Sequence, residues 1–317
     1  MTHSRRFRRS SKLSSWRLLS LHLWGKPRDP TVYGTLEIDM TRALQYLDAV
    51  NSVPGPARAT VTHLVVKAIA KAIAGNPEAN AIVSRRRLYL RDSVDVYCQV
   101  ATDGGDDLSG VKITSADSKP IHEIASEFAS RADRVHDHSD PESEKTKRTM
   151  LGTPRFLLGP LLRLVEYLTY DLRIDLSAFG IAFDQFGSAM VSNVGGFGIE
   201  NGLAPLVPAT RVPVVLLLGE IAERAIVREG RIVAAPCMTI GCTFDHRVLD
   251  GFRAGKLAQV VRACLEDPFK EIGLSSRSSS AGDRLRLGPR DTSDTFPRDS
   301  VCTDRKTESV NDEDLPT

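Results

Sequence analysis

The chain has 317 residues, and its 42 Lys and Arg nearly balance its 40 Asp and Glu, which gives a formal net charge of +2. Neither this charge nor the ordinary apolar fraction of 41% points to a nucleic-acid partner, and no apolar run is long enough to cross a membrane. The five cysteines are scattered without CxxC spacing, which argues against a disulfide framework or a zinc site and favours a reducing, cytoplasmic setting.

The amino-terminal segment is strongly basic. Eight Lys and Arg and no acidic residue fall within the first 28 positions. Residues 1–11 are expected to be disordered, and the main domain is expected over 12–272. A transit peptide has a similar basic, Ser-rich composition, so targeting to an organelle is an alternative to a cytoplasmic location.

Regular elements begin just after this segment. Alternation of apolar and polar residues predicts a strand over 32–39. Thr62 is expected to cap a helix that runs to about residue 74, where Gly75 and Pro77 end it. Further along, the pattern predicts strands over 88–90 and 94–101 and a helix over 121–135.

The second half is rich in strands. Asp250 is well placed as the N-cap of a last helix, whose apolar residues share one face. Helices between runs of strands, without strict βαβ alternation, predict an α+β domain. Two polar segments lack the apolar residues of a core: 137–149 is expected to be an exposed loop, and 275–317 a disordered tail. The predicted strands are 190–194, 212–219, 225–227 and 232–243.

The segment 156–183 fits this pattern less well. It is rich in Leu and aromatic residues, and charged residues are spaced along it. The favoured interpretation is a pair of core or interface helices. A membrane-surface or partner-docking element is the alternative.

The run from Asp245 to Gly251 is the first candidate for chemistry. His246 follows a predicted strand and precedes a predicted helix, and Asp250 lies four residues further on. Histidine suits proton transfer near neutral pH, although a single histidine is more often structural. A metal site is not favoured, because no further histidine or carboxylate cluster accompanies this pair.

Ser192 is the second candidate. It stands at the end of a predicted strand, before a glycine-rich turn. A phosphate-binding loop would need a lysine and a helix start that are missing, and the Gly-x-Ser-x-Gly pattern of a serine nucleophile is absent too. The turn itself has a purely structural explanation in the backbone freedom of glycine. The remaining role for Ser192 is a hydrogen bond to a developing oxyanion.

Together these motifs resemble the catalytic domain of the dihydrolipoamide acyltransferase component of 2-oxo-acid dehydrogenase complexes, which shares its fold with chloramphenicol acetyltransferase. The resemblance covers about residues 12–272 and implies a two-layer sandwich, in which helices cover a mixed sheet. The segments that carry it are Ser15–Leu19, Val32–Thr41, Thr62–Ala81, Ser192-Asn193-x-Gly195, Val212–Glu220 and Asp245-His246-Arg247-x-x-Asp250-Gly251.

The resemblance assigns a role to each candidate residue. It implies that His246 is the general base that deprotonates the acceptor thiol, and that Ser192 stabilises the tetrahedral oxyanion. Asp250 would be chiefly structural and would pair with an amino-terminal arginine, for which Arg17 is the candidate. Coenzyme A would enter as a substrate, and no metal would be needed. The family site lies between subunits of a trimer, so a homotrimer or a larger three-fold assembly is implied.

The chain also departs from the family pattern. Lipoyl and peripheral-subunit-binding domains are not found in it, so a stand-alone form is expected. Such a form would use a separate lipoylated protein, or would act on acyl-CoA with another acceptor. Residues 107–113 depart from the family's apolar strand, which leaves the acyl group undefined. A non-catalytic trimeric scaffold of the same fold is the alternative function.

Overall fold

The computed structural model describes residues 7–9, 14, 15, 19, 29–102, 107–136, 153–179, 181 and 183–274. Arg17, the predicted loop at 137–149 and the predicted tail at 275–317 lie outside these residues, as do most of residues 1–11.

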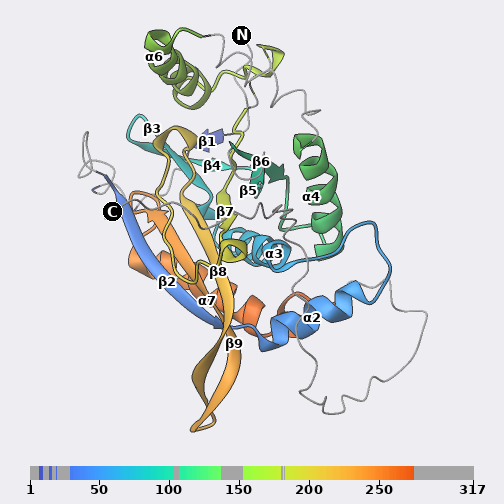
Figure 1. Ribbon diagram of the computed structural model, residues 1–317. Coiled ribbons are helices and arrows are strands. Elements are labelled where there is room, and N and C mark those ends of the chain that lie inside the picture. Colours follow the sequence, from blue (N-terminus) through green and yellow to red (C-terminus); the bar gives the residue numbers. More distant parts are fainter. Residues whose placement is uncertain are drawn as a thin grey trace, which may run out of the picture. The chain divides into compact units, whose positions relative to one another are not determined.

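The main sheet has six strands in the order β2-β9-β8-β7-β5-β6 (Figure 1). β7 runs parallel to both of its neighbours, and every other pair is antiparallel, so the sheet is mixed. The strands are β2 (Thr31–Asp39), β5 (Val96–Thr102), β6 (Asp107–Ile113), β7 (Ala189–Asn193), β8 (Val214–Arg228) and β9 (Arg231–Asp245).

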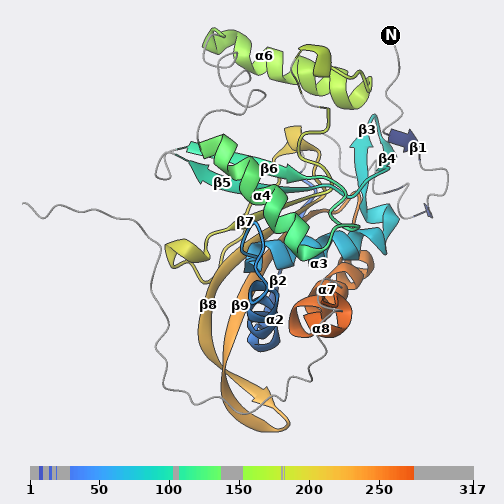
Figure 2. The same cartoon turned by 90° about the vertical axis from the view of Figure 1, so that its right-hand side faces the viewer.

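Helices cover one face of this sheet (Figure 2). Side chains from alternate strand positions, such as Ile38, Val191 and Ile240, are fully buried against them. This is the α+β sandwich of a helical layer on a mixed sheet that the sequence predicts. The covering helices are α2 (Thr41–Asn51), α3 (Val61–Ala74), α4 (Ile121–His136), α7 (Gly251–Glu266) and the short α8 (Pro268–Glu271).

The other face of the sheet has a thinner cover. A small cluster around Met190, Val212 and Val215 packs there under Ala204 and Leu206 from the segment after β7. A separate small sheet pairs β4 (Arg87–Arg91) with β1 (Phe7–Arg9) and β3 (Ala81–Ser84). Short helices complete the description: η1 (Pro77–Ala79), η3 (Tyr167–Asp171), η4 (Ser177–Phe179), η5 (Gly195–Phe197) and η6 (Pro208–Thr210).

The predicted cap of α3 is wrong by two residues. The N-cap is Thr60, whose backbone is extended, and its N–H donates to Nδ1 of His63 at 3.1 Å. Thr62 lies inside the helix, where its hydroxyl accepts a hydrogen bond from Asn193 of β7. Thr60 and Thr62 both carry the hydroxyl that suits an N-cap. The backbone conformation, and not the residue type, decides which of them caps the helix.

The strands predicted at 212–219 and 225–227 form one strand, β8. Its pairing with β9 is interrupted by a register shift between Leu218 and Ile221, where the backbone N–H of Glu220 donates to the carbonyl of Ile199. The β8–β9 hairpin also runs past the end of β2 (Figure 1), so polar side chains there meet solvent instead of a core. The gap in the sequence pattern, residues 220–224, falls at this register shift and at the start of the part of the hairpin that runs past β2.

The segment 156–183 does not form the favoured pair of core helices. A single helix, α6 (Arg155–Glu166), passes into one π-helical turn at η3. None of the described side chains of α6 is buried, whereas Thr169 and Tyr170 of η3 are.

A buried ion pair joins β4 to the segment before β7. The guanidinium of Arg91 donates from Nε to Asp184 Oδ2 at 2.7 Å and from Nη2 to Oδ1 at 3.1 Å. Only 3% of the Arg91 side chain and 11% of the Asp184 side chain are exposed. Arg91 also donates to the carbonyls of Ala81 and Arg211, so this pair connects three stretches of chain.

His63 should make folding depend on pH. Burial lowers its pKa from 6.5 to about 4. Between these values the unfolded chain binds a proton that the folded chain does not, so stability present above pH 6.5 is lost as the pH falls. From about pH 7.5 to about pH 5.5, we expect the free energy of unfolding to fall by about 1.4 kcal/mol more than in His63→Gln.

Denaturant unfolding at the two pH values measures this difference. Glutamine at this position keeps the capping box, so the variant changes the titration and not the helix start. An equal pH dependence in both proteins would show that His63 is not the source.

Candidate active site

His246 sits on a turn that is fixed on both sides. The backbone and side chain of Arg247 bind the carboxylate of Asp245, with Nε at 3.0 Å from Oδ1 and Nη2 at 2.7 Å from Oδ2. The Asp245 carbonyl accepts from the N–H groups of Val248 and Leu249, which are both buried. The N–H of His246 donates to the carbonyl of Pro30, just before β2. These contacts fix the backbone of His246 at the junction of β9 and α7, where its side chain is half-buried.

Asp250 caps α7, as the sequence predicts. Its Oδ1 accepts from the backbone N–H of Arg253 at 2.9 Å, and its Oδ2 accepts from Arg253 Nη1 at 2.8 Å. Arg253 also pairs with Glu78, which follows α3. Asp250 therefore fixes where α7 begins. Through Arg253 it also connects α7 to Glu78, which follows α3.

Replacing Asp250 separates its capping role from its charge. Asp250→Ala should lower the free energy of unfolding by about 1–2 kcal/mol, whereas Asp250→Asn should lower it by less than about 0.5 kcal/mol, because asparagine caps as well as aspartate. Denaturant unfolding of both variants checks this. Equal losses would mean that the charge pairing with Arg253, and not the cap, is what matters.

Ser192 lies at the carboxyl end of β7. It pairs with Leu217 of β8, and it has the same strand parity as Met190, which packs on the face opposite the helices. The next residue, Asn193, accepts from the N–H of Gly195 and so forms the turn that ends the strand. A side chain at Gly195 would collide with the carbonyl of Gly219, so this glycine allows a close approach of two backbones.

Within one chain, Ser192 and His246 do not meet. Through Leu217, Ser192 is in register with Gly241 of β9, two strands away, and His246 lies five residues beyond Gly241. With about 3.3 Å per residue and about 4.8 Å between strands, the two backbones are roughly 20 Å apart. Their side chains are too short to act on one bond together.

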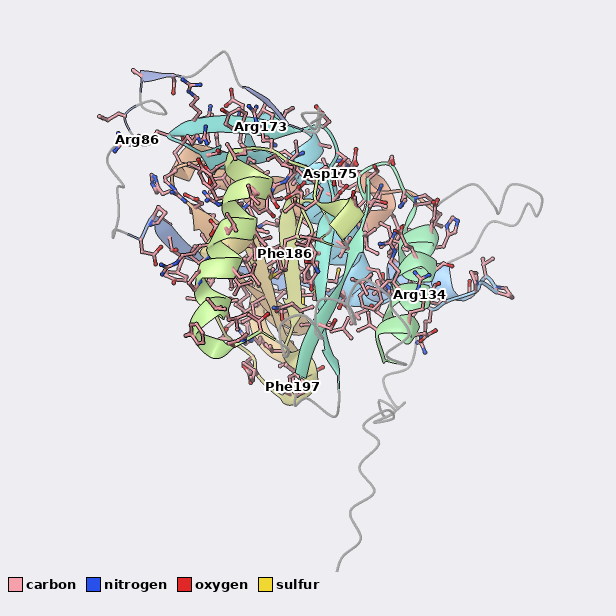
Figure 3. All side chains as sticks on the ribbon, turned by 90° about the horizontal axis from the view of Figure 1, so that it is seen from above. Arg86, Arg134, Arg173, Asp175, Phe186 and Phe197 are labelled. Atoms are coloured by element: carbon pink, nitrogen blue, oxygen red, sulfur yellow. The ribbon has the colours of Figure 1, made fainter. Side chains whose placement is uncertain are left out.

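Exposed side chains surround the Ser192 end of the sheet. The segment after β7 exposes Phe197, Ile199 and Leu203, with Phe197 69% exposed (Figure 3). On the edge strand β2, Tyr33, Thr35 and Glu37 point to solvent, and Tyr33 is 49% exposed. The sheet therefore keeps a thinly covered face and an edge strand with exposed side chains, and a second copy could contact either.

The described residues contain no group of three or more metal-ligating side chains. An apolar cavity of about 200 Å³ lies between β2, β9 and α7, and its walls include Gly34, Phe244, Leu249 and Leu257. No charged side chain lines it, so it offers nothing to bind the phosphates of a nucleotide.

Sequence reasoning proposed His246, Ser192 and Asp250 as site residues, but it gave no role to Asp245 or Arg247. Their spacing was the available signal, because an aspartate side chain commonly binds the backbone two residues further on. Arg17, the predicted partner of Asp250, lies outside the described residues.

The fold belongs to a known class of acyltransferase cores. The cubic core of the pyruvate dehydrogenase multienzyme complex is similar with a TM-score of 0.56 and 16% identity, over 81% of this chain and 88% of that one. The dihydrolipoamide acetyltransferase of Azotobacter vinelandii is similar with a TM-score of 0.56 and 15% identity, over the same shares of the two chains. At these identities the likeness establishes the fold alone.

The family follows from the sequence. The family model of the 2-oxoacid dehydrogenases acyltransferase (catalytic domain) matches residues 26–151 and 184–272. The chain belongs to this family.

One relative is the succinyltransferase component of the mitochondrial 2-oxoglutarate dehydrogenase complex of Bos taurus. It is 32% identical over 130 residues, which are 37% of this chain and 28% of the relative. The match therefore spans less than a third of that protein's length.

Proposed function

We propose that this chain is a CoA-dependent acyltransferase whose site combines His246 of one copy with Ser192 of another. The observation that carries the proposal is the turn that holds His246 at the β9–α7 junction, far from Ser192 of the same chain. Membership of the acyltransferase family supports it. So does the Azotobacter relative, for which a serine, a histidine and an asparagine have been examined in the catalytic mechanism.

The chemistry needs only these groups. The imidazole of His246 takes the proton of the acceptor thiol, and the thiolate attacks the carbonyl carbon of the acyl-CoA thioester. The hydroxyl of Ser192 donates a hydrogen bond to the oxyanion that forms. When the intermediate collapses, the C–S bond to CoA breaks and the CoA thiolate recovers the proton from His246. A thiol with a pKa of about 8.5 needs only a modest base.

A closed three-fold assembly would bring the two residues together. Each subunit would supply His246 to one neighbour and Ser192 to the other, so one contact repeated around the ring would make three sites. The exposed β2 edge and the exposed apolar residues after β7 are the surfaces available for it. The acceptor would be dihydrolipoamide on a separate lipoylated protein, or another thiol.

Turnover by the purified chain tests this proposal. A panel of acyl-CoA thioesters is mixed with dihydrolipoamide, and the new acyl thioester is followed by mass spectrometry. We expect transfer from at least one member of the panel, in a protein that behaves as a trimer or a multiple of three in light scattering. A folded oligomer that transfers no acyl group would instead support the non-catalytic scaffold.

A further inference from the structure

Helix α6 has a narrow polar side with Arg163 and Glu166, and a broad apolar side that is largely exposed. Its partly buried side, with Leu158, Leu161 and Val165, turns toward the protein, while its outer side carries further large apolar residues. A broad apolar side beside a narrow charged side is typical of a helix that lies in a membrane interface. The large apolar residues on the outer side of α6 are Phe156, Leu157, Leu162, Leu164 and the following Tyr167, with exposed fractions between 43% and 78%.

The carboxyl end of this helix is firmly attached. Tyr170 is buried and donates from its hydroxyl to the carbonyl of Thr210 at 3.2 Å. Arg211 pairs with both Glu166 and Asp171, at 2.5 and 3.4 Å. These contacts fix the base of α6 on the body, and they occupy the two acidic groups at that end. The outer apolar side is therefore held in place, and both Glu166 and Asp171 at its base are paired with Arg211.

Arginines gather at the same end. The turn between β3 and β4 exposes Arg85 and Arg86, and Arg87, the first residue of β4, is exposed beside them. The Arg85 guanidinium lies 5.4 Å from the ring centre of Tyr167, and its Nη2 donates to the Tyr167 hydroxyl at 2.8 Å. Seen from above, Arg86 is labelled on the same side of the molecule as α6 (Figure 3). With the exposed Arg163 on the helix itself, positive charge borders the apolar surface.

The family model matches up to residue 151 and resumes at residue 184, so α6 and η3 fall in the gap between the matched segments. The family match therefore gives no role to this apolar surface.

We propose that α6 and the arginine turn at 85–87 form a surface that binds anionic lipid. The apolar side chains enter the boundary between headgroups and acyl chains, and the arginines contact lipid phosphates. The helix would lie in the membrane plane, since no helix among the described residues is long and apolar enough to span a bilayer. The exposed arginines are positively charged, so they favour an anionic lipid surface over a neutral apolar partner.

Flotation with liposomes tests the proposal. The purified chain is mixed with vesicles of phosphatidylcholine alone, and with vesicles that also contain phosphatidylglycerol. We expect wild-type protein to float with the anionic vesicles. The triple change of Leu157, Leu162 and Leu164 to Ser should reduce the bound fraction at least about tenfold, because buried apolar area drives interfacial binding. The triple change of Arg85, Arg86 and Arg87 to Gln should remove the preference for anionic vesicles.

A matched variant controls for a general loss of apolar surface. Val227 and Ile232, at the tip of the β8–β9 hairpin, are 73% and 78% exposed, and changing both to Ser should leave flotation unchanged. Equal flotation of wild type and the leucine variant would overturn the proposal. So would an oligomer that dissociates in the leucine variant without any lipid binding by wild type, because a second copy would then cover α6. Thermal unfolding of each variant checks that it is folded.

Discussion

Changing His246 to alanine is expected to lower kcat for acyl transfer by about 10²- to 10⁴-fold, the usual contribution of a general base. The fixed turn between Asp245 and Arg247 does not depend on the imidazole, so the variant should keep its fold and its oligomeric state. Steady-state kinetics with a saturating acyl-CoA measures the loss. At higher pH the loss should shrink, because more of the acceptor thiol is already ionised.

His122→Ala is the matched control. His122 lies on α4, outside the β9–α7 turn, and its removal should leave kcat near the wild-type value. Activity that survives in His246→Ala but falls in His122→Ala would contradict the assignment of the base.

The second large effect concerns stability. Asp184→Asn keeps the shape of the side chain but leaves the Arg91 guanidinium buried without its counter-charge, so we expect the free energy of unfolding to fall by about 3–5 kcal/mol. Asparagine is chosen because residue 184 has a φ of 49°, a conformation that asparagine tolerates and alanine does not. Chemical denaturation measures the change.

An exposed pair gives the comparison. Arg262 and Glu266 on α7 are 3.0 Å apart, and their side chains are about 40% exposed. Glu266→Ala should cost less than about 1 kcal/mol, because solvent screens such pairs. Similar losses in Asp184→Asn and Glu266→Ala would mean that burial does not raise the contribution of the Arg91 pair.

Much of the fold can be predicted from the sequence where local pattern and burial agree. The strand at 32–39 and the helix capped by Asp250 both follow from periodicity and a capping residue, and both are present. The hairpin of β8 and β9 was harder to predict. The part that runs past β2 does not pack on the core, so polar residues occur in it. Helix α6 was predicted to be more buried than it is. Its apolar side chains indicate burial, but the rest of the chain covers only one side of the helix.

The residues of the candidate site were predictable from the sequence, and the family resemblance also implied a site between subunits. His246 and Ser192 each stand at a strand end that the sequence marks. Their separation comes from strand register, which depends on pairing between distant segments and leaves no local trace. The spacing of Asp245 and Arg247 is a sequence signal for the backbone contact of this turn, whereas the added contact of the Arg247 guanidinium with Asp245 depends on side-chain geometry.

The central claim is that two copies of the chain share each site, and mixed oligomers test it most directly. His246→Ala and Ser192→Ala chains carry different tags, are co-expressed, and are isolated as mixed oligomers. Each mixed trimer should show about a third of wild-type activity, because one of its three sites then pairs an intact His246 with an intact Ser192. If each site lay within one chain, the mixed oligomers would be no more active than the two variants alone, and that result would contradict the account.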